Sequence, residues 1–296
     1  MLVSARFLMI EKGFLTRFVR LCHGRKSNSY EFDTREFENS RFLNQENYWF
    51  SGSRKSRDFR GFQRIWKRKF KMEEKEDKYQ EIIKKYNIDI AKLKKEQEKL
   101  AKQIDIKDSM DFSKAVKIGG ISNIFFQNKI VSVAVVLDDK LEIIEQKYFS
   151  DKVKFPYIPG FRAYRELPAM VSCFNLLDEK PEVVFISGHG ISHERLGLAS
   201  HFSIAVGVPS IGVADELITG KLDGENIIIN EKVVGKLIQL KQGSRPIYVS
   251  PGNGISVKSA VELAKKFIRL PHKLPEPLHF AHRYAREVMK EVTVSS

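Results

Sequence analysis

The sequence predicts a mixed-sheet α/β fold, in which adjacent strands precede alternating helices and strands. β-branched segments joined by short turns predict an antiparallel meander. Further along, short apolar runs typical of buried strands alternate with amphipathic stretches typical of helices. Of the 296 residues, 42% are hydrophobic, which is enough for a core. Because no apolar run approaches the roughly 20 residues of a membrane span, we expect no membrane partner.

The meander is expected over residues 116–148. Its strands are residues 116–124, 130–137 and 141–148, and β-branched residues dominate the second, IVSVAVVL. A charged helix over 72–106 precedes it, since apolar residues recur there at helical spacing. The later elements are, in chain order, a helix over 161–177, a strand over 182–186, a helix over 196–206, strands over 210–214, 233–240 and 246–250, and helices over 255–269 and 280–292.

Residues 1–71 differ from the rest of the chain. They contain 17 Lys and Arg against 7 Asp and Glu, interleaved with aromatic residues. Three interpretations compete: a basic-aromatic arm that binds nucleic acid, an Arg-rich targeting peptide, or translated sequence upstream of a true start at Met72. We favour the third, because a well-formed helix follows Met72 at once. The expected organisation is thus an extension over 1–71 and a folded domain over 72–296.

Charge and cysteine content indicate the class of partner and the compartment. The formal net charge is +14, which favours a polyanionic partner such as DNA or RNA. Two cysteines are too few to cross-link a fold of this size, so a reducing compartment, the cytoplasm, is expected.

The segment PYIPGFRAYREL places a rigid turn before a helix. Pro159 and Gly160 help to fix the turn, and Tyr157 and Ile158 are expected at its tip. The tip is either a loop anchored by packing or a wedge that enters between stacked bases. Glu166, one turn into the helix, is either a surface carboxylate or a metal ligand.

A second polar segment, SGHGISHERLGLASH, follows a buried strand. Ligands of open α/β sheets bind at such strand ends. Gly188 and Gly190 are interpreted as positions where the backbone approaches a substrate closely. His189 and His193 are candidate ligands, proton shuttles or phosphate contacts, and Arg195 is a candidate phosphate contact.

Several motifs in this order resemble endonuclease V, a ribonuclease-H-like nuclease that acts at deaminated bases such as inosine in DNA or RNA. They are EQEKLA, PYIPGFRAYRE, GHGISHERLGLASH, IGVA, YVSPG, LPEP and AHRY, and the likeness runs from about Met72 to the end of the chain. The resemblance implies a monomeric repair nuclease with a ribonuclease-H-like mixed sheet. It also implies Mg²⁺, held by carboxylates, and cleavage one nucleotide 3′ of the deaminated base.

The chain departs from the family pattern where the metal ligands are expected. Ser122 and Ser187 stand where the family has aspartates, whereas the family glutamate is retained as Glu166. The family lysine in GVAK becomes Asp215. A serine oxygen carries no charge, and Mg²⁺ usually requires at least two carboxylates. Mg²⁺ affinity is therefore expected to fall sharply.

These replacements leave competing hypotheses. In the favoured one, the protein keeps the nucleic-acid groove, with Tyr157 and His193 matching the family, but has lost or nearly lost cleavage. In the alternative it is an active nuclease that uses Glu166 and Asp215 as metal ligands, with His193 and His282 among its catalytic residues. A third possibility, a structural remnant, predicts no preference for inosine over guanine.

Overall fold

The computed structural model describes residues 77–240 and 243–294. All of them belong to one compact unit, Lys71–Ser296. The prediction that residues 1–71 form a separate extension, and the proposed start at Met72, lie outside the described residues.

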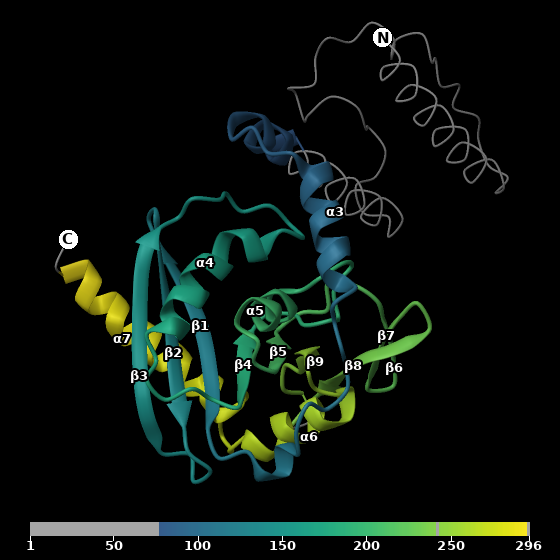
Figure 1. Cartoon of the computed structure of the whole chain (residues 1–296), viewed down its shortest axis with the longest axis vertical. Coiled ribbons are helices and arrows are strands. Elements are labelled where there is room, and N and C mark those ends of the chain that lie inside the picture. Colours follow the sequence, from purple (N-terminus) through teal and green to yellow (C-terminus); the bar gives the residue numbers. More distant parts are fainter. Residues whose placement is uncertain (1–76, 241–242, 295–296) are drawn as a thin grey trace, which may run out of the picture. The chain divides into compact units, whose positions relative to one another are not determined.

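A nine-stranded mixed sheet forms the centre of this unit, in the order β3-β2-β1-β4-β5-β9-β8-β7-β6 (Figure 1). The strands are β1 (Ile118–Phe126), β2 (Lys129–Leu137), β3 (Ile143–Lys152), β4 (Val183–Ser187), β5 (Ser210–Ala214), β6 (Lys221–Asp223), β7 (Asn226–Ile229), β8 (Lys232–Ile238) and β9 (Ile247–Asn253).

The strand pairing confirms the predicted mixed sheet. β1, β2 and β3 form the expected antiparallel meander, in which Ser122 lies opposite Val133. β4 is parallel to both β1 and β5, and β9 then returns antiparallel to β5. The carboxyl ends of β1, β4 and β5 therefore lie along the same edge of the sheet.

The hairpin of β6 and β7 is absent from the sequence prediction. β6 has three residues, all exposed, so it shows none of the alternation between apolar and polar residues that marks a half-buried strand. Gly224, with a φ of 58°, lies in the turn between β6 and β7, a backbone conformation that glycine adopts without strain.

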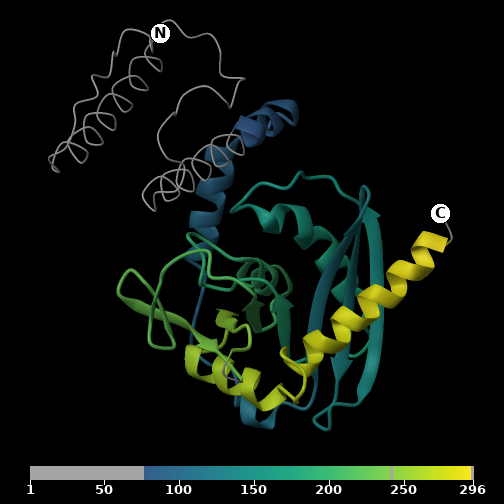
Figure 2. The ribbon, with the colours of Figure 1, turned by 180° about the vertical axis from the view of Figure 1, so that it is seen from behind.

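In the described part of the chain, four helices cover the two faces of the sheet: α4 (Arg162–Asn175), α5 (Leu198–Val206), α6 (Val257–Phe267) and α7 (Glu276–Val294). Helix α3 (Ile90–Ala101) and a short 3₁₀ helix, Phe112–Lys114, precede β1. Figure 1 shows α4 in front of the meander, and Figure 2 shows α7 crossing its opposite face. Within the described residues, no helix is long and apolar enough to cross a membrane.

The helix predicted over 72–106 is interrupted in the structure. Residues 77–85 are helical, and the chain then turns before α3 begins. Asn87 has a φ of 50°, and Asp89 caps α3 by accepting a hydrogen bond from the backbone N–H of Lys92 at 2.9 Å. Asn tolerates the left-handed conformation, and Asp is a favoured N-cap, which accounts for the break.

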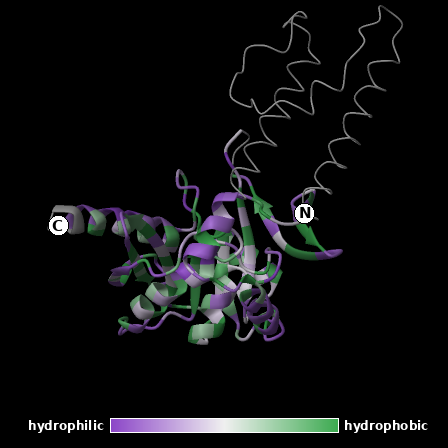
Figure 3. Ribbon diagram, turned by 90° about the horizontal axis from the view of Figure 1, so that it is seen from above, coloured by the Kyte–Doolittle hydropathy of each residue, from purple (hydrophilic) through white to green (hydrophobic). Residues whose placement is uncertain are grey.

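Side chains of β1 point alternately to the two helical layers, as the geometry of a strand requires. Ile118 packs into the cluster that includes α6, whereas Ile121 packs into the cluster that includes α4 and α5. Figure 3 shows the hydrophobic colouring concentrated along strands between these layers. β1 can therefore present polar side chains to either layer near its end.

Candidate functional site

Glu166 is the buried acidic centre of the candidate site. It lies on α4 with 2% of its surface exposed. Arg162, one turn earlier, donates from Nε to Oε1 and from Nη2 to Oε2, the latter at 3.0 Å. Asn123 of β1 donates from Nδ2 to Oε2 at 2.7 Å. Both carboxylate oxygens thus accept hydrogen bonds, and the buried negative charge is balanced by a guanidinium group.

The Arg162 guanidinium lies beside the end of β4. A Cβ placed on Gly188, which follows Ser187, would lie 3.3 Å from Arg162 Nη1. Burial lowers the pKa of His189, and the positive charge of Arg162 lowers it further. A fixed cation therefore lies between Glu166 and the strand-end loop that the sequence identified.

The two polar residues of β1 face opposite layers. A Cβ on Gly120 would lie 2.0 Å from the carbonyl oxygen of Pro277 in α7, and Ile124 packs against the same helix. Ser122 lies between these two positions in the alternation and faces α7 as well. Asn123 faces α4 instead, so the β1 residue that reaches Glu166 is Asn123.

The sequence analysis did not identify Asn123 or Arg162 as residues of the site. The spacing of four residues between Arg162 and Glu166 in a predicted helix was the available signal, since such residues are neighbours on the helix surface. The role of Asn123 had no comparable signal. It depends on which face of β1 the side chain takes, and its Oδ1 is buried without a hydrogen-bond partner.

Asp215 does not join Glu166 in this structure. It follows β5 with a side chain that is 75% exposed, and its Oδ1 accepts a hydrogen bond from Lys273 Nζ at 2.6 Å. Within residues 77–240 and 243–294, no three His, Cys, Asp or Glu side chains are placed to hold a metal ion. The pairing of Glu166 with Asp215 as metal ligands, which the alternative hypothesis requires, would need Asp215 to leave Lys273.

The histidines of the site are held in their neutral forms. His189 Nε2 donates to the carbonyl oxygen of Glu216 at 2.8 Å. His193 Nδ1 accepts from the backbone N–H of Arg195 at 3.2 Å, and burial lowers the pKa of His193 to about 4. Burial also lowers the pKa of His282, whose Nε2 is buried without a partner. These histidines contribute no positive charge toward a phosphate at neutral pH.

The turn before α4 presents one exposed aromatic ring. Tyr157 is 53% exposed, and Pro159 is exposed beside it. Ile158 is 4% exposed, so the expectation that it lies at the tip with Tyr157 is wrong. It is an apolar anchor that packs beneath the turn, and the exposed part of a base-contacting wedge would be Tyr157.

Arg195 fixes this turn instead of standing free to bind phosphate. Its Nε donates to Gln97 Oε1 at 2.7 Å, and Gln97 Nε2 donates to the carbonyl oxygen of Gly160 at 3.0 Å. The Arg195 side chain is 10% exposed, pairs with Glu194 at 2.8 Å and lies over the ring of Phe161. The predicted role of Arg195 as a phosphate contact is therefore corrected to that of an anchor.

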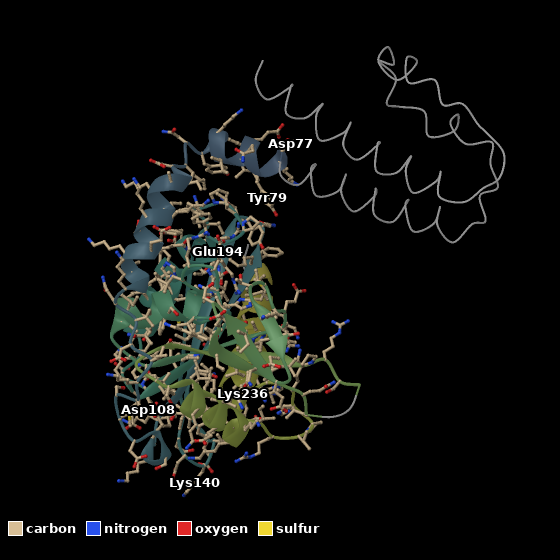
Figure 4. The ribbon with its side chains drawn as sticks, turned by 90° about the vertical axis from the view of Figure 1, so that its right-hand side faces the viewer. Asp77, Tyr79, Asp108, Lys140, Glu194 and Lys236 are labelled. Carbon is tan, nitrogen blue, oxygen red and sulfur yellow. The ribbon has the colours of Figure 1, made fainter. Side chains whose placement is uncertain are left out.

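Gln97 is a further residue that the sequence analysis missed. It is 1% exposed and connects α3 with both the strand-end loop and the turn before α4. Glu194, labelled in Figure 4, lies in the same loop as Arg195. The motif EQEKLA contains Gln97, but the motif alone did not indicate that its amide joins two loops.

Packing explains Gly190 better than substrate approach does. A Cβ on Gly190 would lie 2.0 Å from the carbonyl oxygen of Pro251, and the Gly190 N–H donates to Ser250 Oγ at 3.0 Å. The strand-end loop thus lies directly against β9. The interpretation of Gly190 as a point of close substrate contact is replaced by one of loop packing.

Comparison with known proteins shows the family of the chain. Residues 98–283 match the family model described as Endonuclease V. The chain belongs to the endonuclease V family. Endonuclease V of Thermosipho melanesiensis is 34% identical over 183 residues, covering 59% of this chain and 80% of that protein. Endonuclease V of Dictyoglomus turgidum is 34% identical over 203 residues, covering 65% and 88%.

Solved structures of endonuclease V share the fold. The catalytic domain of human Endonuclease V is 25% identical with a TM-score of 0.63, covering 69% of this chain and 97% of that chain. A point variant of Ciona intestinalis Endonuclease V is 26% identical with a TM-score of 0.63, covering 69% and 98%. The Ciona structure is a complex with a 23mer DNA containing an inosine followed by a ribo-adenosine.

The residues present do not fit the Mg²⁺ that endonuclease V enzymes typically use. Mg²⁺ requires hard, charged oxygen ligands in near-octahedral geometry. In this chain Ser122 and Ser187 are neutral, and both oxygens of Glu166 already accept hydrogen bonds. The positive charge of Arg162 beside Glu166 also repels a divalent cation. The described residues therefore do not supply the charged oxygen ligands that Mg²⁺ requires.

Proposed function

We propose that this protein binds DNA or RNA containing a deaminated purine, of the inosine type, and has lost the Mg²⁺-dependent cleavage of its family. The observation that carries the proposal is the pairing of Glu166. The carboxylate expected to hold the metal is bound by Arg162 and Asn123, and the other two metal positions are serines.

Support for nucleic-acid binding comes from the turn before α4. Tyr157 is exposed on a turn whose backbone is fixed by Gln97 and Ile158. An exposed ring on a rigid support can stack on a base at little entropic cost. The formal net charge of +14 also favours a polyanion. An inosine-containing DNA is bound by the relative from Ciona intestinalis.

The charges of the groups around Glu166 support the loss of cleavage. Hydrolysis of a phosphodiester by a metal-activated water needs a cation held opposite the phosphate by carboxylates. Glu166 is the one carboxylate retained at the three family positions, and a guanidinium already neutralises it. Asp215 would have to leave Lys273 to contribute a second carboxylate.

Labelled single strands, in DNA and RNA forms, test both parts of the proposal. One strand carries inosine and its control carries guanine at the same position. The full chain is expected to bind the inosine strand more tightly and to leave it uncut with Mg²⁺ or Mn²⁺. Cleavage that disappears in Glu166→Gln would establish the alternative, an active nuclease using Glu166 and Asp215. Equal affinity for both strands would contradict base recognition.

A further inference from the structure

We infer that the Arg162 guanidinium binds a backbone phosphate of the nucleic acid at the end of β4, and that this contact needs no metal ion. The inference rests on the proposed function and adds to it the group that takes the phosphate. A fixed protein cation replaces the positive charge that a metal supplies in the relatives.

Arg162 has N–H donors that its pair with Glu166 does not use. The hydrogen bonds to the carboxylate use Nε and Nη2, and within the described residues Nη1 donates to no acceptor. A guanidinium carries five N–H donors in a planar fork that matches the oxygens of a phosphate. The Nη1 edge can therefore donate to a ligand without breaking the pair with Glu166.

The free edge points to the functional end of the sheet. Nη1 lies beside Gly188, where the absence of a side chain lets the guanidinium pack against the strand-end loop. The Arg162 side chain is 41% exposed, so solvent and a bound strand can reach it. The exposed ring of Tyr157 lies five residues earlier, on the turn that leads into α4. A base stacked on that ring would bring its own backbone toward the start of α4.

Other cations near this loop do not meet the same requirements. The Arg195 side chain is 10% exposed and is held by Gln97 and Glu194. Burial lowers the pKa of His189 and of His193, so both are neutral at neutral pH. Among the residues described around Gly188, Arg162 is the group that is cationic, accessible and equipped with a free donor edge.

The pair with Glu166 orients the guanidinium. A bidentate contact to a buried carboxylate fixes the plane of the fork, so less rotamer entropy is lost when a phosphate binds. Glu166 is thus a positioning residue for Arg162. Arginine stays protonated across the accessible pH range. Because the contact involves no metal ion, we expect chelators to leave it unchanged.

The test measures affinity of the full chain for an inosine-containing single strand by fluorescence anisotropy, over a series of salt concentrations, with EDTA or with Mg²⁺. The unaltered protein is expected to bind the strand with the same affinity in EDTA and in Mg²⁺. Arg162→Leu combined with Glu166→Gln removes the pair without leaving a buried charge. It is expected to weaken binding about tenfold, the loss of one charge-assisted hydrogen bond. It should also reduce the slope of log K against log salt by about 0.7, the value for one phosphate contact on a single strand.

The matched control is Lys140→Leu, which removes one positive charge from the β2–β3 turn. Figure 4 places Lys140 at the far end of the domain from Glu194, and Figure 1 shows α4 away from that turn. Its salt slope should equal that of the unaltered protein. Because every variant is the full chain, binding by residues outside the site is common to all of them and does not affect the comparison.

Two results would separate failure of the inference from failure of the proposed function. If the unaltered protein binds inosine strands but the double variant keeps the same affinity and salt slope, Arg162 contacts no phosphate and the inference is overturned alone. If the unaltered protein shows no preference for inosine over guanine, the proposed function fails, and the inference fails with it. An affinity that drops in EDTA would also overturn the inference.

Discussion

Placing aspartates at positions 123 and 187 should create a metal site only weakly while Arg162 remains, because Asn123 is the β1 residue that reaches Glu166. The perturbation is Asn123→Asp with Ser187→Asp, made with and without Arg162→Leu. The double variant gains two carboxylates but keeps Glu166 bound by the guanidinium. In the triple variant a neutral side chain replaces the cation, and the carboxylate of Glu166 becomes available to a metal.

The size of the effect follows from the charge on the guanidinium. A divalent ion about 4 Å from a unit positive charge is repelled by about 2 kcal/mol in the dielectric of water and by about 8 kcal/mol at an effective dielectric constant of about 20. Since the Arg162 side chain is 41% exposed, the lower figure applies. It corresponds to about a 30-fold weaker metal affinity in the double variant than in the triple variant.

Isothermal titration with Mg²⁺ and with Mn²⁺ measures this difference directly, and cleavage of an inosine strand gives a second readout. Circular dichroism and thermal unfolding check that both variants are folded. We expect the triple variant to bind metal at least about 30-fold more tightly. Equal affinities in the two variants would refute the reasoning, because Arg162 would then present no barrier to a metal ion. Absence of binding in both would show that the surrounding frame no longer accepts one.

Three further predictions concern other parts of the site. Because burial lowers the pKa of His193 to about 4, the unfolded chain takes up its proton near pH 6.5 and stability falls as the pH drops below that value. Urea titration should show that the loss of stability between about pH 7.5 and pH 4.5 is about 2–3 kcal/mol smaller in His193→Asn than in the unaltered protein, and an equal loss in both proteins would contradict the shift. Gly190→Ala should lower the free energy of unfolding by about 3 kcal/mol, because its Cβ would meet the Pro251 carbonyl at 2.0 Å, and unchanged stability would contradict that packing. Tyr157→Ala should weaken binding of an inosine strand by about 1–3 kcal/mol with little change in the melting temperature, and unchanged affinity would exclude stacking on this ring.

Much of the fold could be predicted because its elements carry strong local signals. β2 is rich in β-branched residues, and the meander turns are short and polar, so the three strands of the meander and their antiparallel directions could be predicted. The β6–β7 hairpin could not be predicted, since the three residues of β6 are all exposed and β7 has only four residues. The break before α3 depends on the left-handed backbone of Asn87, which the helical spacing of the apolar residues concealed.

Only the parts of the candidate site that lie within a single sequence motif could be predicted. Tyr157 and Glu166 lie in a single motif, so their neighbourhood was visible in the sequence. The anchoring of Arg195 was not, because its partner Gln97 is 98 positions away in the chain. When that partner is not known, the residue type and its place in a strand-end loop predict a phosphate contact.

The orientation of β1 determines which of its residues contacts Glu166. Sequence comparison directs attention to Ser122, yet the side chain that reaches Glu166 belongs to Asn123. Adjacent residues of a strand face opposite layers, so a choice of one position changes the predicted neighbours completely. Only the pairing of β1 with its neighbours and the packing of α7 settle which residue faces α4.

Titration of the unaltered full chain with Mn²⁺, followed by electron paramagnetic resonance of the free ion, tests most directly whether Arg162 and Asn123 have taken the place of the metal. Glu166→Gln serves as the reference. The pairing predicts that both proteins leave the same fraction of Mn²⁺ free at every concentration. Binding of one Mn²⁺ per chain that is lost in Glu166→Gln would contradict it and show that Glu166 still holds a metal ion.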